Sequence, residues 1–245
     1  METYVQGKMR VWTTKNRIKI FQVLSGRSNA YLIVKDKAVM LVDTGKASAF
    51  ETLSKNIQSL NIAINDVSDV ILTHTHFDHC QSAKILKEKC ACHIMVSGSA
   101  ANSIKIGYTK LSDGTFLSTK LIASFGRLWG RTMFGYEPFS PDIFINGEFD
   151  LIVSEGSIKI IETAGHSSDS VSILVDNEIA IVGDVMFGVF KNSVFPPYAD
   201  NISSMIESWG KLLYTDCRIF LPGHGNQISR NLLKHEYEKY ARKYK

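Results

Sequence analysis

Chemistry-bearing residues crowd into one short stretch, Thr73 to Cys80, which reads THTHFDHC. Three of the chain's seven histidines fall here, beside a carboxylate. The four side chains are His74, His76, Asp78 and His79. Imidazole and carboxylate groups bind borderline and hard divalent cations in proteins. The competing interpretation, a solvated loop with an incidental carboxylate, leaves this crowding unexplained, so we expect a metal site.

The residues before this stretch indicate how the backbone presents it. Val70-Ile71-Leu72 is a short apolar run between polar residues, which is typical of a buried strand, so the histidines begin where that strand ends. Open α/β sheets carry their sites at such ends. Because they are two residues apart on an extended segment, His74 and His76 point to the same side. If the chain then turns into a helix, Asp78 and His79 face a second position, and the pattern predicts a place for two metal ions.

Three later segments put a histidine or an aspartate after an apolar run that is typical of a strand. They are Ala164-Gly165-His166, Gly183-Asp184 and Gly223-His224-Gly225. Together with His74-x-His76-x-Asp78-His79, and in the same order along the chain, they resemble the signature of the metallo-β-lactamase-fold hydrolase superfamily. The resemblance covers most of the chain, from about residue 18 to residue 224.

This resemblance implies an α/β fold: a four-layer αββα sandwich in which two mixed β-sheets are flanked by helices. It also implies a dinuclear metal centre with seven ligands. His74, His76 and His166 would bind the first ion, Asp78, His79 and His224 the second, and Asp184 would bridge them. A ligand set of histidine and aspartate suits zinc best, with iron or manganese as alternatives.

Such a centre does hydrolytic chemistry without a serine or cysteine nucleophile. Two cations about 3.5–4 Å apart can share a hydroxide and polarise a carbonyl or phosphoryl group. Asp78 and Asp184 are the candidate catalytic residues, since Asp78 would orient the hydroxide and carry its proton to the leaving group. The best-known β-lactamases of this fold have a cysteine where Asp184 stands, so the resemblance points away from antibiotic hydrolysis and toward the ester, thioester, lactone and phosphodiester branches. Among these, the abundant aromatics and the mild net charge favour cleavage of a small ester, thioester or lactone.

Two other enzyme classes share the site and remain alternatives. A phosphodiesterase or nuclease-type metallohydrolase would use the same ligands, and a persulfide-dioxygenase-like enzyme would hold one iron on the three histidines. A binding module with a decayed site is disfavoured because no ligand is missing. Glyoxalase II adds a helical substrate domain for which few residues remain after His224, so we expect a stand-alone hydrolase.

Composition agrees with one compact domain spanning residues 1–245. Apolar residues make up 44% and charged residues 21%, which is enough for a sizeable core. The net charge of +4 is mild and dispersed, so nucleic-acid binding is permitted but not indicated. No apolar stretch resembles a signal peptide or a membrane span, which predicts a cytoplasmic protein that acts on a small-molecule substrate away from membranes. The oligomeric state is not predicted.

The predicted elements follow from apolar periodicity. Strands are expected at 18–24, 30–34 and 38–42 in the first sheet, and at 151–153, 157–162, 171–175 and 179–182 in the second half. Ser48 is expected to cap a helix that runs to Leu60. By the resemblance Asp43 lies near the metals, although a plain turn residue is the competing interpretation. Cys80 is expected to pack rather than to bind metal.

Two segments are expected to build the substrate pocket. The first is a helical insertion at about 97–149, most of whose aromatics should pack on the core, with Lys120, Arg127 and Arg131 forming a solvated flank. The second is the loop 187–200, which contains Phe190 and Tyr198. In lactonase relatives a tyrosine from this region donates a hydrogen bond to the substrate, so Tyr198 is a candidate for that role, against ordinary packing.

Overall fold

Two β-sheets form the centre of the molecule. The computed structural model describes residues 4–6 and 9–244. The first sheet holds eight strands in sequence order, antiparallel from β1 to β5 and parallel from β5 to β8. They are β1 (Tyr4–Gln6), β2 (Met9–Thr13), β3 (Lys19–Leu24), β4 (Ala30–Lys35), β5 (Ala38–Val42), β6 (Asp69–Ile71), β7 (His93–Ser97) and β8 (Ile143–Ile145).

The second sheet has six strands in the order β14-β13-β12-β11-β10-β9, and its β12–β13 pair is parallel. Its strands are β9 (Phe149–Leu151), β10 (Ile158–Glu162), β11 (Val171–Val175), β12 (Ile179–Gly183), β13 (Ile219–Pro222) and β14 (Ile228–Ser229). Both sheets are therefore mixed, as expected.

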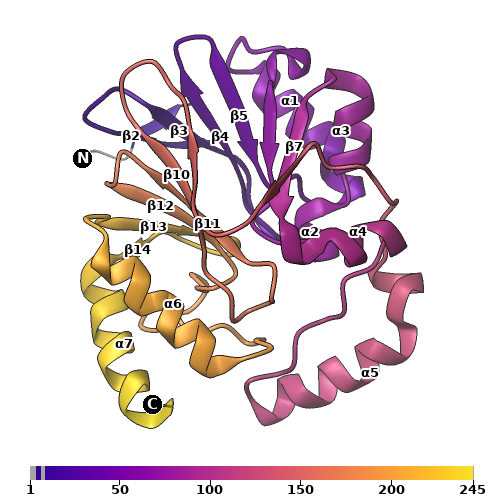
Figure 1. Ribbon diagram of the computed structural model, residues 1–245, viewed down its shortest axis with the longest axis vertical. Coiled ribbons are helices and arrows are strands. Elements are labelled where there is room, and N and C mark those ends of the chain that lie inside the picture. Colours follow the sequence, from indigo (N-terminus) through magenta and orange to yellow (C-terminus); the bar gives the residue numbers. More distant parts are fainter. Residues whose placement is uncertain (1–3, 7–8, 245) are drawn as a thin grey trace.

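Helices cover the outer face of each sheet (Figure 1). Leu53 of α1 and Leu86 of α3 belong to the core on the first sheet, and Trp209 of α6 and Leu233 of α7 belong to the core on the second. The helices are α1 (Phe50–Gln58), α2 (Phe77–Cys80), α3 (Ala83–Cys90), α4 (Ala101–Ile106), α5 (Leu117–Phe134), α6 (Ile202–Tyr214) and α7 (Arg230–Tyr244), with 3₁₀ turns at Ala47–Ala49, Ile64–Asp66 and Gly98–Ala100. The four-layer αββα sandwich is confirmed.

The alternation of side chains along the strands explains this layering. Successive residues of a strand point to opposite faces. In β4, Ile33 joins the core between the sheets while Leu32 joins the core under α1 and α3. In β10, Ile160 faces the inter-sheet core and Ile161 faces α6. Strands buried on both faces therefore read as continuous apolar runs.

Several sequence-based details were wrong. In the first sheet, β6 and β7 lie close to the strands expected at 70–72 and 93–96, but β1, β2 and β8 were not expected, and β2 has no long apolar run. The strand expected at 151–153 lies at Phe149–Leu151, and Ile152 is 99% exposed. Ser48 caps no helix, because it lies inside the 3₁₀ turn that precedes α1. Short edge strands carry little periodic signal, which is why they escape such predictions.

The segment 97–149 contains α4, α5 and the edge strand β8, and it departs from expectation in one respect. Most of its aromatics were expected to pack on the core, and Tyr136 and Phe139 do so, but Phe125 and Trp129 of α5 are 66% and 65% exposed. Ala123 is the one buried residue of this helix. Figure 1 shows α5 apart from the helices that cover the sheets.

The helices of the described chain are also informative about membranes. None of them, within residues 4–6 and 9–244, is both long and apolar enough to cross a bilayer.

Candidate metal centre

All seven predicted ligands meet at one edge of the sandwich. Their candidate donor atoms form three overlapping groups, within each of which the atoms lie within 4.8 Å of one another. The groups are His74, His76 and His166; His74, His79 and Asp184; and Asp78, His79 and His224. The first and third groups match the two sets inferred from the resemblance. The second group, which contains Asp184, joins them.

Asp184 stands between the two sets. Its carboxylate oxygens lie 3.7 Å from His166 Nε2, 3.5 Å from His79 Nε2 and 3.2 Å from His224 Nε2. It therefore reaches histidines of both sets, which is the placement expected of a bridging ligand. It follows β12 directly, so the sheet fixes its position.

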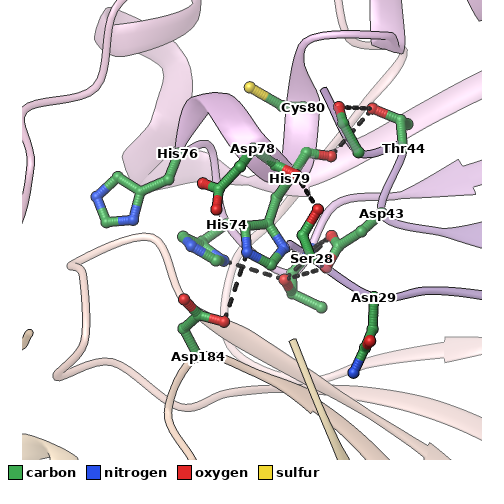
Figure 2. Close-up of polar contacts among 12 residues, drawn as sticks. Ser28, Asn29, Asp43, Thr44, His74, His76, Asp78, His79, Cys80 and Asp184 are labelled. Atoms are coloured by element: carbon green, nitrogen blue, oxygen red, sulfur yellow. Dashed lines mark hydrogen bonds and ion pairs between the residues drawn. The ribbon is translucent and has the colours of Figure 1, made fainter. Parts of the chain in front are cut away.

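The backbone turns at the end of β6 in the way the sequence indicated. His74 and His76 lie on the non-helical segment after the strand, and their ring centroids are 4.7 Å apart. Helix α2 then begins at Phe77 and carries Asp78 and His79 to the other set. Figure 2 shows His74, His79 and Asp78 gathered above Asp184, with His76 farther along the same segment.

Hydrogen bonds at the outer ring nitrogens orient the histidines of the first set. His74 Nδ1 donates to Thr73 Oγ1 (3.1 Å), and His166 Nδ1 donates to the backbone oxygen of Tyr198 (2.9 Å). His76 Nε2 donates to the backbone oxygen of Lys110 (3.2 Å), so its Nδ1 faces His166 Nε2 at 3.0 Å. The free nitrogen of each ring therefore faces the cluster, as in metal sites whose ligands are held by outer partners.

Asp43 orients the second set. Its Oδ2 accepts a hydrogen bond from His79 Nδ1 at 2.9 Å, and the same carboxylate accepts bonds from Thr73 N (2.8 Å) and Thr73 Oγ1 (2.8 Å). Asp43 is buried and has a left-handed backbone (φ 61°), a strained conformation for a residue other than glycine. It thus does more than form a turn, because it holds His79 and Thr73 in place.

Two buried polar atoms of the cluster lack a hydrogen-bond partner within the described part of the chain: His74 Nε2 and Asp184 Oδ1. A buried polar atom without a hydrogen bond is costly unless an ion or water satisfies it. Gly223 lets the backbone approach these ligands closely, since a Cβ added there would lie 2.1 Å from Asp184 Oδ1 and 2.7 Å from His79 Cε1. These residues therefore fit divalent metal ions.

The charge states of the metal-free cluster agree with cation binding. Burial lowers the pKa of His74 well below its usual value and the pKa of His166 to about 4, which keeps both rings neutral. Burial also acts on His79, but Asp184, Asp43 and Asp78 outweigh it and raise the pKa of His79 to about 10. A cation at the second set would therefore displace a proton from His79.

Sequence reasoning missed the residues that hold this loop. Asp169 is buried, and its Oδ2 accepts hydrogen bonds from Thr75 N (2.8 Å) and Thr75 Oγ1 (2.6 Å). Ser28 Oγ donates to the backbone oxygen of Asp78 (2.7 Å), and Thr44 N donates to that of His79 (2.7 Å). Asp169 lies three residues after His166, a proximity that could have drawn attention to it.

The remaining histidines and Cys80 lie outside the cluster. Cys80 is buried in the core, its Sγ donates to the backbone oxygen of Thr75, and Figure 2 shows it pointing away from Asp184. His93 heads β7 and pairs with Asp69 at the surface, and His235 lies in α7. None of the three belongs to the metal-ligand groups found among the described residues.

A cavity of about 300 Å³ opens beside the candidate metal centre. His76, Asp78, His166, Asp184 and His224 form one wall. The opposite side is mostly apolar and comes from the two segments that the sequence singled out: Leu111, Ile122, Ala123, Gly126 and Phe134 from the insertion, and Phe187, Pro196, Pro197 and Tyr198 from the loop 187–200. No lysine or arginine of the described chain lines it.

The two candidate substrate-loop residues are placed differently. Tyr198 lines the cavity, and burial raises the pKa of its hydroxyl. Phe190 is half-exposed, packs against Phe187 at 5.9 Å between ring centroids, and is not among the residues that line the cavity. The structure therefore brings Tyr198, but not Phe190, to the site.

Comparison with known proteins agrees with this geometry. The family model "Metallo-beta-lactamase superfamily" matches residues 25–224. A probable metallo-hydrolase of Methanocaldococcus jannaschii is 27% identical over 65% of this chain and 68% of its own. The hydroxyacylglutathione hydrolase GloC of Haemophilus influenzae is 27% identical over 85% of this chain and 91% of its own.

The chain spans only 51% and 62% of two other curated relatives. Among solved structures, a subclass B3 metallo-β-lactamase of Bradyrhizobium japonicum superposes with a TM-score of 0.68 at 15% identity, over 92% of this chain and 89% of its own, which shows a shared fold. The family match, the αββα sandwich and the histidine–aspartate cluster agree, and the chain belongs to the metallo-β-lactamase superfamily, as a hydrolase whose site can hold divalent metal.

Proposed function

We propose that this protein is a hydrolase with a dinuclear centre, most simply two zinc ions, with iron or manganese as alternatives. His74, His76 and His166 would hold one ion, Asp78, His79 and His224 the other, and Asp184 would contact both. Two separate ligand groups, joined by a third group that contains Asp184, support this assignment over a single ion. When bound, such a pair supplies a hydroxide nucleophile at neutral pH and polarises the substrate.

The chain's own residues have separate tasks in this scheme. Asp78 lines the cavity and lies 3.5 Å from His224, so its carboxylate can both hold a ligand position and pass a proton to the leaving group. The carboxylate of Asp184 balances positive charge between the two sets. Burial raises its pKa, but His224, His79 and His166 outweigh burial and hold that pKa well below its usual range, so it is ionised at neutral pH.

We further propose that the substrate is a small ester, thioester or lactone. The absence of lysine and arginine from the cavity lining, within the described residues, carries this choice. A phosphodiester needs cationic groups near its non-bridging oxygens, whereas a carbonyl substrate needs an apolar pocket beside the metals. Lys120, Arg127 and Arg131 of α5 do not supply such cationic groups, because none of them lines the cavity. Arg127 instead pairs with Asp113.

The relative named hydroxyacylglutathione hydrolase also bears on the substrate. It matches this chain over 91% of its own length, so a protein of that name needs no large additional domain. Chain length therefore does not distinguish this protein from hydroxyacylglutathione hydrolases. An acyl derivative of a thiol belongs among the substrates to be tested.

One side-by-side assay tests the proposal. The zinc- or manganese-loaded protein is offered p-nitrophenyl acetate, an acyl thioester and a lactone, and in parallel bis-p-nitrophenyl phosphate and a cyclic nucleotide. We expect turnover of the carbonyl substrates. Turnover of the phosphate esters alone would overturn this choice of substrate, and one bound iron with oxidation of a persulfide would favour the dioxygenase alternative.

Tyr198 is the candidate donor to the substrate oxygen. Removing one such donor costs up to about 100- to 1,000-fold in kcat where it stabilises the transition state. We expect Tyr198→Phe to lower kcat by at least about tenfold while metal content is unchanged. Phe190→Ala serves as a control on the same loop. If kcat is unchanged in Tyr198→Phe, Tyr198 does not act as a hydrogen-bond donor to the substrate and only packs.

A further inference from the structure

The far end of the cavity has features that the proposed hydrolysis does not require. Apart from the metal ligands, Ser112 and Tyr198, the cavity lining is apolar, and its α5 side is formed by Ile122, Ala123, Gly126 and Phe134. The hydroxyl of Ser112 is already engaged, because its Oγ donates to the backbone oxygen of His166 (2.5 Å). This end of the cavity therefore offers apolar contact and no charge.

The space depends on small residues on the inner side of α5. Ala123 is 1% exposed, and Gly126 faces the apolar lining, since a Cβ added there would lie 3.1 Å from Leu111 Cδ1 and 3.4 Å from Phe134 Cε2. A larger side chain at position 126 would therefore extend among residues that line the cavity. Glycine within a helix costs about 1 kcal/mol relative to alanine, so its presence here has no helix-forming reason.

We propose that this apolar end is an acyl-chain slot and that Gly126 sets its length, a proposal that rests on the proposed hydrolase function. The substrate would be an ester or thioester whose acyl part is an aliphatic chain. The reacting carbonyl lies at the metal wall, the chain extends between α5 and Pro196-Pro197, and the leaving group points toward solvent.

The chemistry of the two substrate halves favours the acyl side for this slot. Leaving groups that are thiol carriers are polar and would lose hydrogen bonds in a space without free polar groups. An aliphatic chain loses no hydrogen bonds there, and its affinity rises about threefold to fourfold for each methylene that is buried. The prolines at 196 and 197 stiffen the wall opposite α5, which favours a chain of defined length over an adaptable ligand.

The first test is a chain-length series. The metal-loaded protein is assayed with p-nitrophenyl esters from acetate to decanoate, and with alkyl acetates in which the chain lies on the leaving side. We expect kcat/KM to rise about threefold per methylene along the acyl series until the slot is full, and to stay flat along the alkyl series. A flat acyl series with turnover of acetate, or a rise along the alkyl series, would overturn the slot.

Variants on α5 and beside it locate the slot. Gly126→Leu is expected to lower kcat/KM for long esters by about 10- to 100-fold more than for acetate. Leu111→Ala, which enlarges the space, should shift the preference toward longer chains. The matched control is Ser124→Leu, which adds the same side chain to an exposed position of the same helix. An equal effect of Gly126→Leu on all chain lengths would contradict the proposal.

A binding measurement separates the slot from the hydrolase. Calorimetry of the metal-loaded protein with acetate, hexanoate and decanoate should give affinity that rises with chain length in the wild type and not in Gly126→Leu. If decanoate binds in this way while no carbonyl ester of any length is cleaved, the slot stands and the hydrolase function fails. If short esters are cleaved while carboxylate affinity is independent of length, the hydrolase stands and the slot fails.

Discussion

The metal loop and helix α5 face each other across one cavity, but the fold holds them in different ways. His74, Thr75 and His79 are at most 1% exposed, and hydrogen bonds with Thr73, Asp169 and Asp43 fix their outer atoms. In α5, Phe125 is 66% exposed and Ala123 is the one buried residue. A site for chemistry needs fixed geometry, whereas a wall for an apolar chain needs only shape. Four experiments test this contrast.

The largest effect is expected from Asp184→Ala. Because this carboxylate contacts histidines of both sets, its loss leaves two cations with less neutralising charge. We expect metal content to fall together with activity, the latter by more than about 1,000-fold in kcat/KM, or about 4 kcal/mol. Asp150→Ala, at an exposed position of β9, is the control, and full turnover in Asp184→Ala would refute the two-metal scheme.

Removing metal should loosen the wall formed by the metal ligands and leave the wall formed by α5 unchanged. When the concentration of free metal is 100 times the dissociation constant, binding adds about 2.7 kcal/mol to the free energy of unfolding. A chelator should therefore lower the melting temperature. Hydrogen exchange should then accelerate at the amides of Thr73 and Thr75 more than at those of α5. An equal change in both walls would show that α5 depends on the metal loop, and adding metal back serves as the control.

A smaller effect is expected from Asp43→Asn, which keeps the shape of the side chain but weakens its hold on His79. Loss of such an outer partner typically lowers metal affinity by about 10- to 100-fold. Competition with a chelator measures the two dissociation constants, and we expect the set containing His79 to weaken. The control is Asp66→Asn, a turn carboxylate that accepts a hydrogen bond from Ala63 N. If the metal affinity of Asp43→Asn is unchanged, Asp43 serves only as a turn residue.

The smallest effect is expected on the outer side of α5. Leu128 is 80% exposed, so Leu128→Ala should change the free energy of unfolding by less than about 0.5 kcal/mol. The matched substitution Leu53→Ala in α1, where the side chain is fully buried, should cost about 2–5 kcal/mol. Denaturant unfolding measures both values. A large loss in Leu128→Ala would mean that α5 packs more tightly than its exposure indicates.

The sequence by itself determined the ligands of the candidate centre. Residue type and local spacing indicated a metal site at His74 to His79, and the family resemblance added His166, Asp184 and His224. Each of these seven side chains lies in the cluster. The principal strands could likewise be located from apolar runs, because burial on both faces leaves a local pattern. The sandwich arrangement itself came from the family resemblance.

Only the tertiary structure decided how the ligands are held and what faces them. Asp43 reaches Thr73 across 30 positions of sequence and Asp169 reaches Thr75 across 94, so no local pattern reports either contact. The apolar residues of α5 show the same helical periodicity whether they pack on the core or face solvent. The periodicity therefore could not show that Phe125 and Trp129 are exposed. Which side of α5 meets the metal wall, and hence the role of Gly126, depends on where the fold places the helix.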